Sequence, residues 1–512
     1  MRQFYRKKLN DLLGAAGDEE FVQLLWATHA LQSEYSDKAR AFIKLETIPE
    51  GAVTTDGLSK FFIQKWEIET LANELMTVPK VTQPKRGRFR NLRCDHFGSI
   101  IECVNRLKEL ENAEFKPEKM NQSIYIEMAR IASQQFDWQR GFANKPQFFR
   151  NAFVYGQGEC ARYFEHTYGI TMNRFSQIGF MLYVSLTNNP VVQNNDEWEK
   201  FGVNRDEMEK VLKLISQPFA SASRTATQQR RGIFHTAYRP SILRQTPCLR
   251  FGEMGARVRA PLPELILERI TSGVFYDIVD GGGAIRNDYG RRFEEYCFSY
   301  LSTTFPALSW STETQYGKRS NKYDSPDLLC REDGQVKIAF ECKSSRMSQK
   351  AKFGSDPMAA RGFDDMIKAV FQLWRFFSHS RRNRSGYEVS ENAVGVVLTL
   401  DNWLVLANTL QERVIREARE MADAKDMEIL EIDRKPIVFV AIVELERILS
   451  SASEVTFKEA LAVANSEKYS GWRIDTIHKD LLGQRVPQKR EYAFASKQGQ
   501  LLPWWGNWTA HK

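Results

Sequence analysis

Two acidic residues and a lysine stand out because their types and spacing could support hydrolysis of a phosphate ester. Asp327 follows a proline, and Glu341 and Lys343 are separated by one residue in a segment of alternating polarity. Residues two apart on a β-strand project from the same face of a sheet. Two converging carboxylates supply the oxygen ligands that a hard cation such as Mg²⁺ prefers. A neighbouring ammonium can orient the attacking water or neutralise charge on the phosphate.

These three residues meet only if the chain forms a β-hairpin of the right register. We predict a three-residue turn from Glu332 to Gly334, with Gly334 in the left-handed conformation that glycine adopts at little cost. This register places Asp327 opposite Ala339 and on the same face as Glu341. A two-residue turn would move Asp327 to the other face, so a shared site predicts the turn type.

Helices and strands alternate around this hairpin, which favours an α/β layer. Helices are predicted over 287–305, 364–377 and 410–425, and strands over 393–400, 403–407 and 437–443.

The first part of the chain has a different pattern, with apolar residues at three- and four-residue spacing and little alternation. We predict a largely all-α recognition or regulatory domain over 1–220 and a basic linker with a short β-hairpin over 221–260. The α/β domain follows over 261–450, and a helical, aromatic tail covers 451–512. Its tryptophans, Trp504, Trp505 and Trp508, are predicted to fill a hydrophobic groove or to dock a partner.

Composition limits the class of protein. The 512 residues carry a net charge of +8, which favours a polyanionic partner. The seven cysteines are scattered without disulfide-like spacing and indicate reduced thiols in a cytoplasmic protein. The longest apolar stretch, 178–186, is too short to cross a membrane. A glycine-rich phosphate loop ending in Lys-Ser or Lys-Thr is absent, which argues against an intrinsic NTPase.

The segments Pro326-Asp327 and Glu341-Cys342-Lys343 resemble the two halves of the motif of the PD-(D/E)xK nuclease superfamily. The resemblance covers roughly 261–449 and implies a restriction-endonuclease-like fold, with a central mixed sheet flanked by helices. It also implies hydrolysis of phosphodiester bonds with Mg²⁺, for which Mn²⁺ would substitute, held by Asp327 and Glu341.

Two flanking helices agree with the resemblance. In the family, the helix before the hairpin often supplies a carboxylate, and Glu294 occupies the matching position. Glu294 is in helical register with Cys297 and Leu301 and so faces the apolar side, where an unpaired carboxylate is costly. The next helix often carries a glutamine that holds the scissile phosphate or water, which Gln372 matches. The alternatives are a helix-surface acid, a surface glutamine and, for the hairpin, a solvent-facing charge ladder.

Basic residues near these elements and in the N-terminal part are predicted to contact nucleic acid, although charged runs are also common in solvated loops. They are Arg86, Arg88, Arg90, Arg346, Lys350, Arg381, Arg382 and Arg384. An alternative metal site, zinc at Cys94, His96 and Cys103, has no fourth ligand at a suitable spacing.

We therefore expect a metal-dependent nuclease that cuts DNA, with RNA as the alternative substrate. Analogy of architecture suggests a prokaryotic defence endonuclease directed against phage or plasmids. The alternatives are a recombination, repair or transposition nuclease acting on DNA ends or branches, and a catalytically silent DNA-binding scaffold. Cutting both strands requires two sites, which favours a homodimer or a partner subunit of a defence complex.

Overall fold

The computed structural model divides into two compact units. The first comprises Met1–Ile124, Ser133–Asn144 and Ala161–Asp280, and the second comprises Tyr125–Ala132, Lys145–Cys160 and Gly281–Lys512. Within these units the structure describes residues 1–80, 92–114, 130–132, 134–135, 138–139, 141–142, 144–231, 233, 235–319, 321–347, 361–402, 408–483, 485 and 490–505. Both units are therefore built from segments that are discontinuous in sequence.

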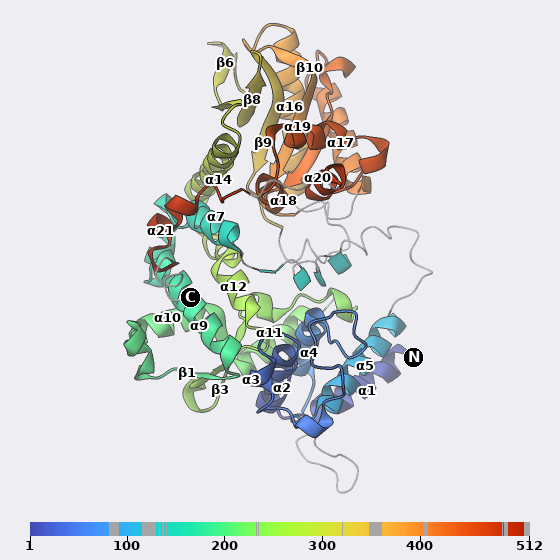
Figure 1. Ribbon diagram of the computed structural model, residues 1–512, viewed down its shortest axis with the longest axis vertical. Helices are drawn as coiled ribbons and strands as arrows, with labels where there is room; N and C mark the ends of the chain where they lie inside the picture. Colours follow the sequence, from blue (N-terminus) through green and yellow to red (C-terminus); the bar gives the residue numbers. More distant parts are fainter. Residues whose placement is uncertain are drawn as a thin grey trace. The chain divides into compact units, whose positions relative to one another are not determined.

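The first unit is largely helical, as the spacing of its apolar residues predicts. Its main helices are α1 (Arg2–Gly14), α2 (Asp18–Leu31), α4 (Lys65–Thr77), α5 (Phe97–Glu114), α9 (Met172–Asn188) and α10 (Arg205–Ile215) (Figure 1). Helix α2 begins with three acidic residues, which the positive end of the helix dipole favours. Helix α10 begins with a capping box between Asn204 and Glu207. Trp26 and Phe97 are fully buried in the core of this unit.

The start of the predicted linker is a helix, so this part of the sequence prediction is wrong. Helix α11 (Phe219–Arg230) buries Ala222 and Ala226, which lie one turn apart. Arg230 also donates a hydrogen bond of 2.8 Å to Thr77 at the end of α4. Only small residues form the buried stripe of α11, and hydrophobic periodicity does not detect such a helix.

A small four-stranded sheet completes the unit, in the order β1-β4-β3-β2. Its strands are β1 (Val192–Gln193), β2 (Ser216–Pro218), β3 (Cys248–Phe251) and β4 (Arg257–Arg259). Strands β3 and β4 pair antiparallel, which confirms the predicted short hairpin.

Several arginines of the first unit form ion pairs with buried carboxylates of the same unit. The buried Glu74 carboxylate forms ion pairs with Arg6 and Arg239. Similarly, Arg244 forms an ion pair of 2.7 Å with the buried Glu69. These arginines are therefore matched by buried carboxylates and belong to the core of the unit.

The second unit contains a five-stranded mixed sheet in the order β11-β10-β9-β8-β5 (Figure 1). The strands are β5 (Ser309–Thr312), β8 (Leu328–Glu332), β9 (Gln335–Lys343), β10 (Val389–Thr399) and β11 (Ile437–Ala441). The three strands β9, β10 and β11 are parallel, whereas β8 pairs antiparallel with β9 and with β5. The predicted strand 403–407 lies outside the described residues. The predicted strand 437–443 ends earlier, since Ile442 begins a helix.

Helices α14 (Gly283–Thr304), α16 (Arg361–Arg381), α17 (Asn408–Lys425) and α18 (Ile442–Leu449) belong to the same unit. The predicted stripe of α16 is buried and packs with Ala339 and Val397 of the sheet. The thiol of Cys342 interacts with Cys297 of α14. Because β-strand residues alternate in direction, α14 and α16 cover opposite faces of the sheet at β9. The hairpin that carries the predicted site therefore lies in the interior of the sheet.

The turn between β8 and β9 differs from the prediction. Glu332 pairs with Gln335, which leaves a two-residue turn in which both Asp333 (φ 54°) and Gly334 (φ 79°) are left-handed. A two-residue turn alone would move Asp327 to the other face of the hairpin. A β-bulge reverses this change, because the pairing register shifts between Cys330 and Arg331. A turn and a bulge together restore the parity that the three-residue turn would have given.

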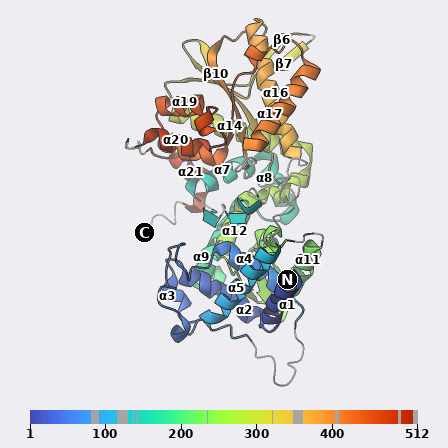
Figure 2. The same ribbon diagram turned by 90° about the vertical axis from the view of Figure 1, so that its right-hand side faces the viewer.

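The sequence also gave no indication of a second, two-stranded hairpin, β6 (Gln315–Lys318) and β7 (Asn321–Asp324). It lies beside α16 in both views (Figures 1 and 2). The Tyr316 hydroxyl is 2.9 Å from Nδ1 of His379 at the end of α16, and the Tyr323 ring meets the His379 ring edge-on at 4.4 Å.

His379 makes this anchor sensitive to pH. The residue is 1% exposed, and burial, followed by the charge of Arg382, lowers its pKa from 6.5 to about 4. The unfolded state therefore binds a proton first as pH falls. The neutral His379 side chain stabilises the folded state fully above about pH 6.5, and this stabilisation is lost as pH falls towards 4. We expect the stability advantage of the wild type over His379→Gln to shrink by on the order of 2 kcal/mol across this window. Urea unfolding at several pH values measures it, and a constant difference would contradict the assignment.

Candidate active site

The structure brings Asp327, Glu341 and Lys343 together, as the motif predicts. Leu328 pairs with Phe340, so Asp327, one residue earlier, lies level with Glu341 and not opposite Ala339 as predicted. The Lys343 ammonium donates to Oε2 of Glu341 at 2.7 Å. Oδ2 of Asp327 accepts a hydrogen bond of 2.6 Å from the backbone N–H of Cys342. Both carboxylates therefore converge on the carboxyl-terminal end of β9.

Burial dominates the electrostatics of this cluster. Glu341 is 3% exposed. Desolvation raises the pKa of Glu341 above its usual range, and the lysine contact only partly offsets this effect. Desolvation also raises the pKa of Asp327. Burial acts to lower the pKa of Lys343, but the charges of Glu341 and Asp327 outweigh it and raise that pKa. The site thus holds two carboxyl groups against a single ammonium, in surroundings with little water.

Glu294 belongs to the same electrostatic cluster, as predicted from its position on α14. Its carboxyl group is partly buried, and the helix residues Cys297 and Leu301 in register with it are fully buried. Desolvation, followed by the charge of Asp327, raises the pKa of Glu294 to about 7. An acid whose pKa is raised by a neighbouring acid lies in an excess of negative charge.

Sequence reasoning missed a fourth acid, Glu313. It follows β5 directly, and desolvation and then the charge of Asp327 raise its pKa. Strand β5 is short and polar on its exposed side, so no alternation predicted it. Glu313 could have been found only by predicting that β5 pairs with β8.

Gln372 of α16 also reaches the cluster. Its Oε1 lies 3.4 Å from the Lys343 ammonium, on the side opposite α14. Lys343 therefore contacts one acid and one amide, which fixes the position of the ammonium. This placement agrees with the predicted site and not with a surface glutamine.

The predicted nucleic-acid contacts are less well supported by geometry. Arg346 is 13% exposed and lies 3.7 Å from Asp401. Arg381 pairs with Asp433 at 2.8 Å. Arg382 and Arg384 both pair with Glu428.

These arginines have acidic partners within the chain, so phosphate would have to compete for them. The remaining predicted contacts, Arg86, Arg88, Arg90 and Lys350, lie outside the described residues, as does Trp508.

The residues that could hold a divalent cation are Asp327, Glu341 and Glu294. All supply oxygen, and their shared excess of negative charge fits a hard cation. Within the described part of the chain, however, no three His, Cys, Asp or Glu side chains are already arranged as a metal site. One oxygen of Glu341 accepts from Lys343 and one of Asp327 accepts from the backbone, so each carboxylate has a second oxygen outside these contacts.

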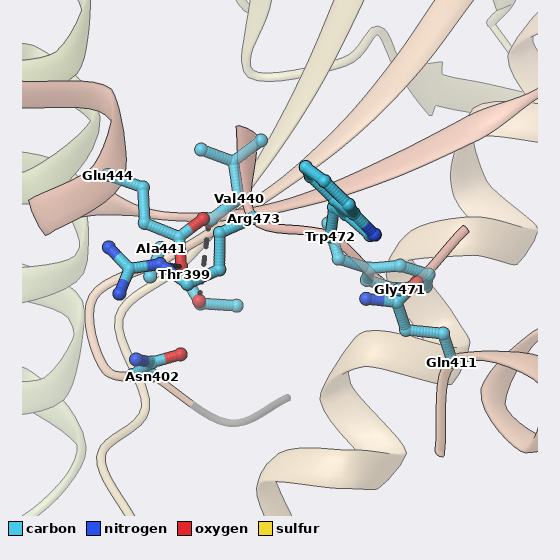
Figure 3. Close-up of a pocket in the computed structure, with 10 residues that line it drawn as sticks. Thr399, Asn402, Gln411, Val440, Ala441, Glu444, Gly471, Trp472 and Arg473 are labelled. Carbon is cyan, nitrogen blue, oxygen red and sulfur yellow. Dashed lines mark hydrogen bonds and ion pairs between the residues drawn. The ribbon is translucent and has the colours of Figure 1, made fainter. Parts of the chain in front are cut away.

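A small pocket opens at the carboxyl ends of β10 and β11 (Figure 3). It is lined by Thr399, Asn402, Glu444, Trp472 and Arg473, among others, and Arg473 forms an ion pair of 3.2 Å with Glu444. Its volume of about 20 Å³ is enough for about one water molecule.

No family model, curated protein or solved structure matches this chain. Among the described residues, no helix is long and apolar enough to span a bilayer.

Proposed function

We propose that this chain is a Mg²⁺-dependent nuclease of the PD-(D/E)xK superfamily, with a restriction-endonuclease-like fold in its second unit. The observation that carries the proposal is the buried Asp327–Glu341–Lys343 cluster on an interior hairpin. A charge ladder facing solvent would have ordinary pKa values, whereas burial raises the pKa of both acids. Proteins rarely maintain such an unbalanced buried cluster without a functional reason.

The order of elements also supports the proposal. Helix α14, the β8–β9 hairpin, helix α16 and the parallel strand β10 follow one another in the order that the superfamily uses. Two further side chains support the proposal: Gln372 of α16 lies 3.4 Å from the Lys343 ammonium, and Glu294 of α14 interacts electrostatically with Asp327 and Lys343.

Each residue then has a role. Asp327, Glu341 and Glu294 would hold the cation, with Mn²⁺ as a substitute for Mg²⁺. When bound, Mg²⁺ would polarise the phosphate and lower the pKa of a coordinated water. Lys343 would leave Glu341 to donate to the attacking water or to a phosphate oxygen. Gln372 would keep the Lys343 ammonium aimed at the reacting atoms.

DNA is the proposed substrate, and a defence endonuclease against phage or plasmids is the proposed role. The test is incubation of the full chain with supercoiled plasmid and Mg²⁺, with EDTA as the control. Nicked or linear product supports a nuclease, whereas binding without cleavage would favour the alternative, a DNA-binding scaffold without catalytic activity. Comparing circular, linear and branched DNA, and RNA, separates the defence role from processing of ends or branches.

Glu294→Gln should weaken cation binding on the order of tenfold, as expected when one oxygen ligand loses its charge. The pKa of Glu294 is raised to about 7, and a cation needs the deprotonated form. Wild-type affinity should therefore rise from about pH 6 to about pH 8, and the variant should show a weaker rise. Calorimetric titration with Mn²⁺ measures both effects.

The matched control is Glu295→Gln, because Glu295 is the next residue and pairs with Arg291 at the surface. It should leave Mn²⁺ affinity unchanged. Equal effects of the two substitutions would remove Glu294 from the site.

A further inference from the structure

The tip of the β6–β7 hairpin carries exposed positive charge. Lys318, Arg319 and Lys322 are all exposed, and Asn321 beside them is exposed as well. None of the three cations has an ion-pair partner in the part of the chain that the structure describes. The arginines of 381–384, by contrast, are paired with acids. The hairpin tip therefore holds cations that are available to an external anion.

Nearer its base, the same hairpin is firmly anchored. Tyr316 is 8% exposed, and its ring stacks on Tyr323 at 5.9 Å. The Arg375 guanidinium of α16 lies over the Tyr323 ring at 5.2 Å. Together with the His379 contact, these interactions fix one face of the ribbon to α16. The cations at the tip are thus presented by a rigid element rather than by a free loop.

The close pairing of β6 and β7 depends on the glycine at position 317. Its φ is +99°, and a Cβ atom there would lie 2.5 Å from the backbone oxygen of Asn321. Any other residue at this position would push the two strands apart.

The base of the hairpin is tied directly to the candidate active site. Ser325 N–H donates to the Thr314 carbonyl at 2.9 Å, and Thr314 N–H donates to Ser325 Oγ at 2.9 Å. Asp327 follows two residues later. A four-residue strand at ~3.3 Å per residue places the tip ~13 Å from the base. Each DNA strand advances ~3.4 Å of helix axis per phosphate, so this span corresponds to about four nucleotides.

We propose that the β6–β7 hairpin is a DNA-binding ribbon, in which Lys318, Arg319 and Lys322 contact backbone phosphates about four nucleotides from the scissile phosphate. This inference rests on the proposed nuclease function and identifies the surface that positions its duplex substrate. A two-stranded ribbon has the width of the DNA major groove. Lysine, arginine and asparagine are the side chains that commonly contact phosphate.

A protein partner fits this surface less well. The described residues of the tip, 317–319 and 321–322, include no apolar or aromatic side chain. The centre of a protein interface is usually built on such anchors. Duplex DNA needs only the cations and their fixed spacing.

The test compares wild type with the variant Lys318→Ala/Arg319→Ala/Lys322→Ala. A fluorescent 30-base-pair duplex is titrated with the full chain at several salt concentrations, with Ca²⁺ in place of Mg²⁺ to prevent turnover. We expect Kd to rise at least tenfold and the slope of log K against log salt to fall by about 2 to 3, since each lost phosphate contact contributes about 0.9. The matched control is Lys479→Ala/Arg485→Ala/Lys497→Ala, which removes three exposed cations of the same unit. It should change neither quantity.

The outcomes separate this inference from the proposed function. An unchanged Kd and slope in the hairpin variant would overturn the ribbon, even if wild type cleaves DNA. A large loss of duplex binding in that variant would support the ribbon, even if no cleavage is found and the nuclease proposal fails. Wild type that binds no duplex, or binds an acidic protein in its place, overturns the inference. The circular dichroism spectrum of each variant confirms that it is folded.

Discussion

Asp327→Ala and Lys343→Ala should each reduce Mg²⁺-dependent cleavage of plasmid DNA about a thousandfold, while duplex binding in Ca²⁺ is largely kept. The first variant removes a carboxylate that faces Glu341 across the ladder. The second removes the ammonium that contacts the buried Glu341 carboxylate at 2.7 Å. Both changes act on groups that would stabilise the transition state rather than the bound ground state. Initial rates on supercoiled plasmid measure the effect, and full activity in both variants would remove these residues from the chemistry.

The control for Lys343→Ala must also break an ion pair on the same hairpin. Glu332, at the end of β8, pairs with Lys458 at 2.8 Å, and both side chains are about one-third exposed. Glu332→Ala should therefore cost less than about 1 kcal/mol and leave cleavage unchanged. Lys343→Ala leaves a buried carboxyl group without its partner, so its stability must be measured as well. Lys343→Met retains more of the packing and should lose cleavage equally.

The candidate cluster was predictable because its residues are close in sequence. Glu341 and Lys343 share a strand, and the parity of a hairpin decides whether Asp327 joins them. The face on which Asp327 lies was predicted correctly, although the length of the turn was not. The bulge beside Arg331 has no signature in the sequence, because any residue can be the extra one in an antiparallel ladder.

Other features depend on contacts between distant segments and could not be predicted in this way. Glu313 reaches the site only because β5 pairs with β8 at the edge of the sheet. The β6–β7 hairpin is polar on its exposed side and has just two inward tyrosines, so its alternation is weak. Helix α11 is buried through alanines, which carry little hydrophobic signal. Elements with large apolar faces, such as α16, were placed within a few residues.

The position of Glu294 depends on a buried network that leads to the last prediction. Arg150, on α7 (Lys145–Tyr155), forms an ion pair with Glu446 of α18, and the two side chains are 6% and 5% exposed. The Tyr296 hydroxyl of α14 donates to the same Glu446 carboxylate at 2.8 Å. Tyr296 is two residues after Glu294, so this network fixes the helix that brings Glu294 to the site.

Arg150→Met should lower the free energy of unfolding by about 3 to 5 kcal/mol, because it leaves Glu446 buried without a positive partner. Urea unfolding measures the loss. Lys468→Met, which breaks an exposed pair with Asp480, should leave the free energy of unfolding nearly unchanged, because solvent screens such a pair. In Arg150→Met/Glu446→Leu no charge is left buried, so the double variant should be more stable than Arg150→Met alone. A loss in Arg150→Met no larger than in the surface control would show that the pair does not hold α14. Weaker Mn²⁺ binding in folded Arg150→Met would instead connect this network to the position of Glu294.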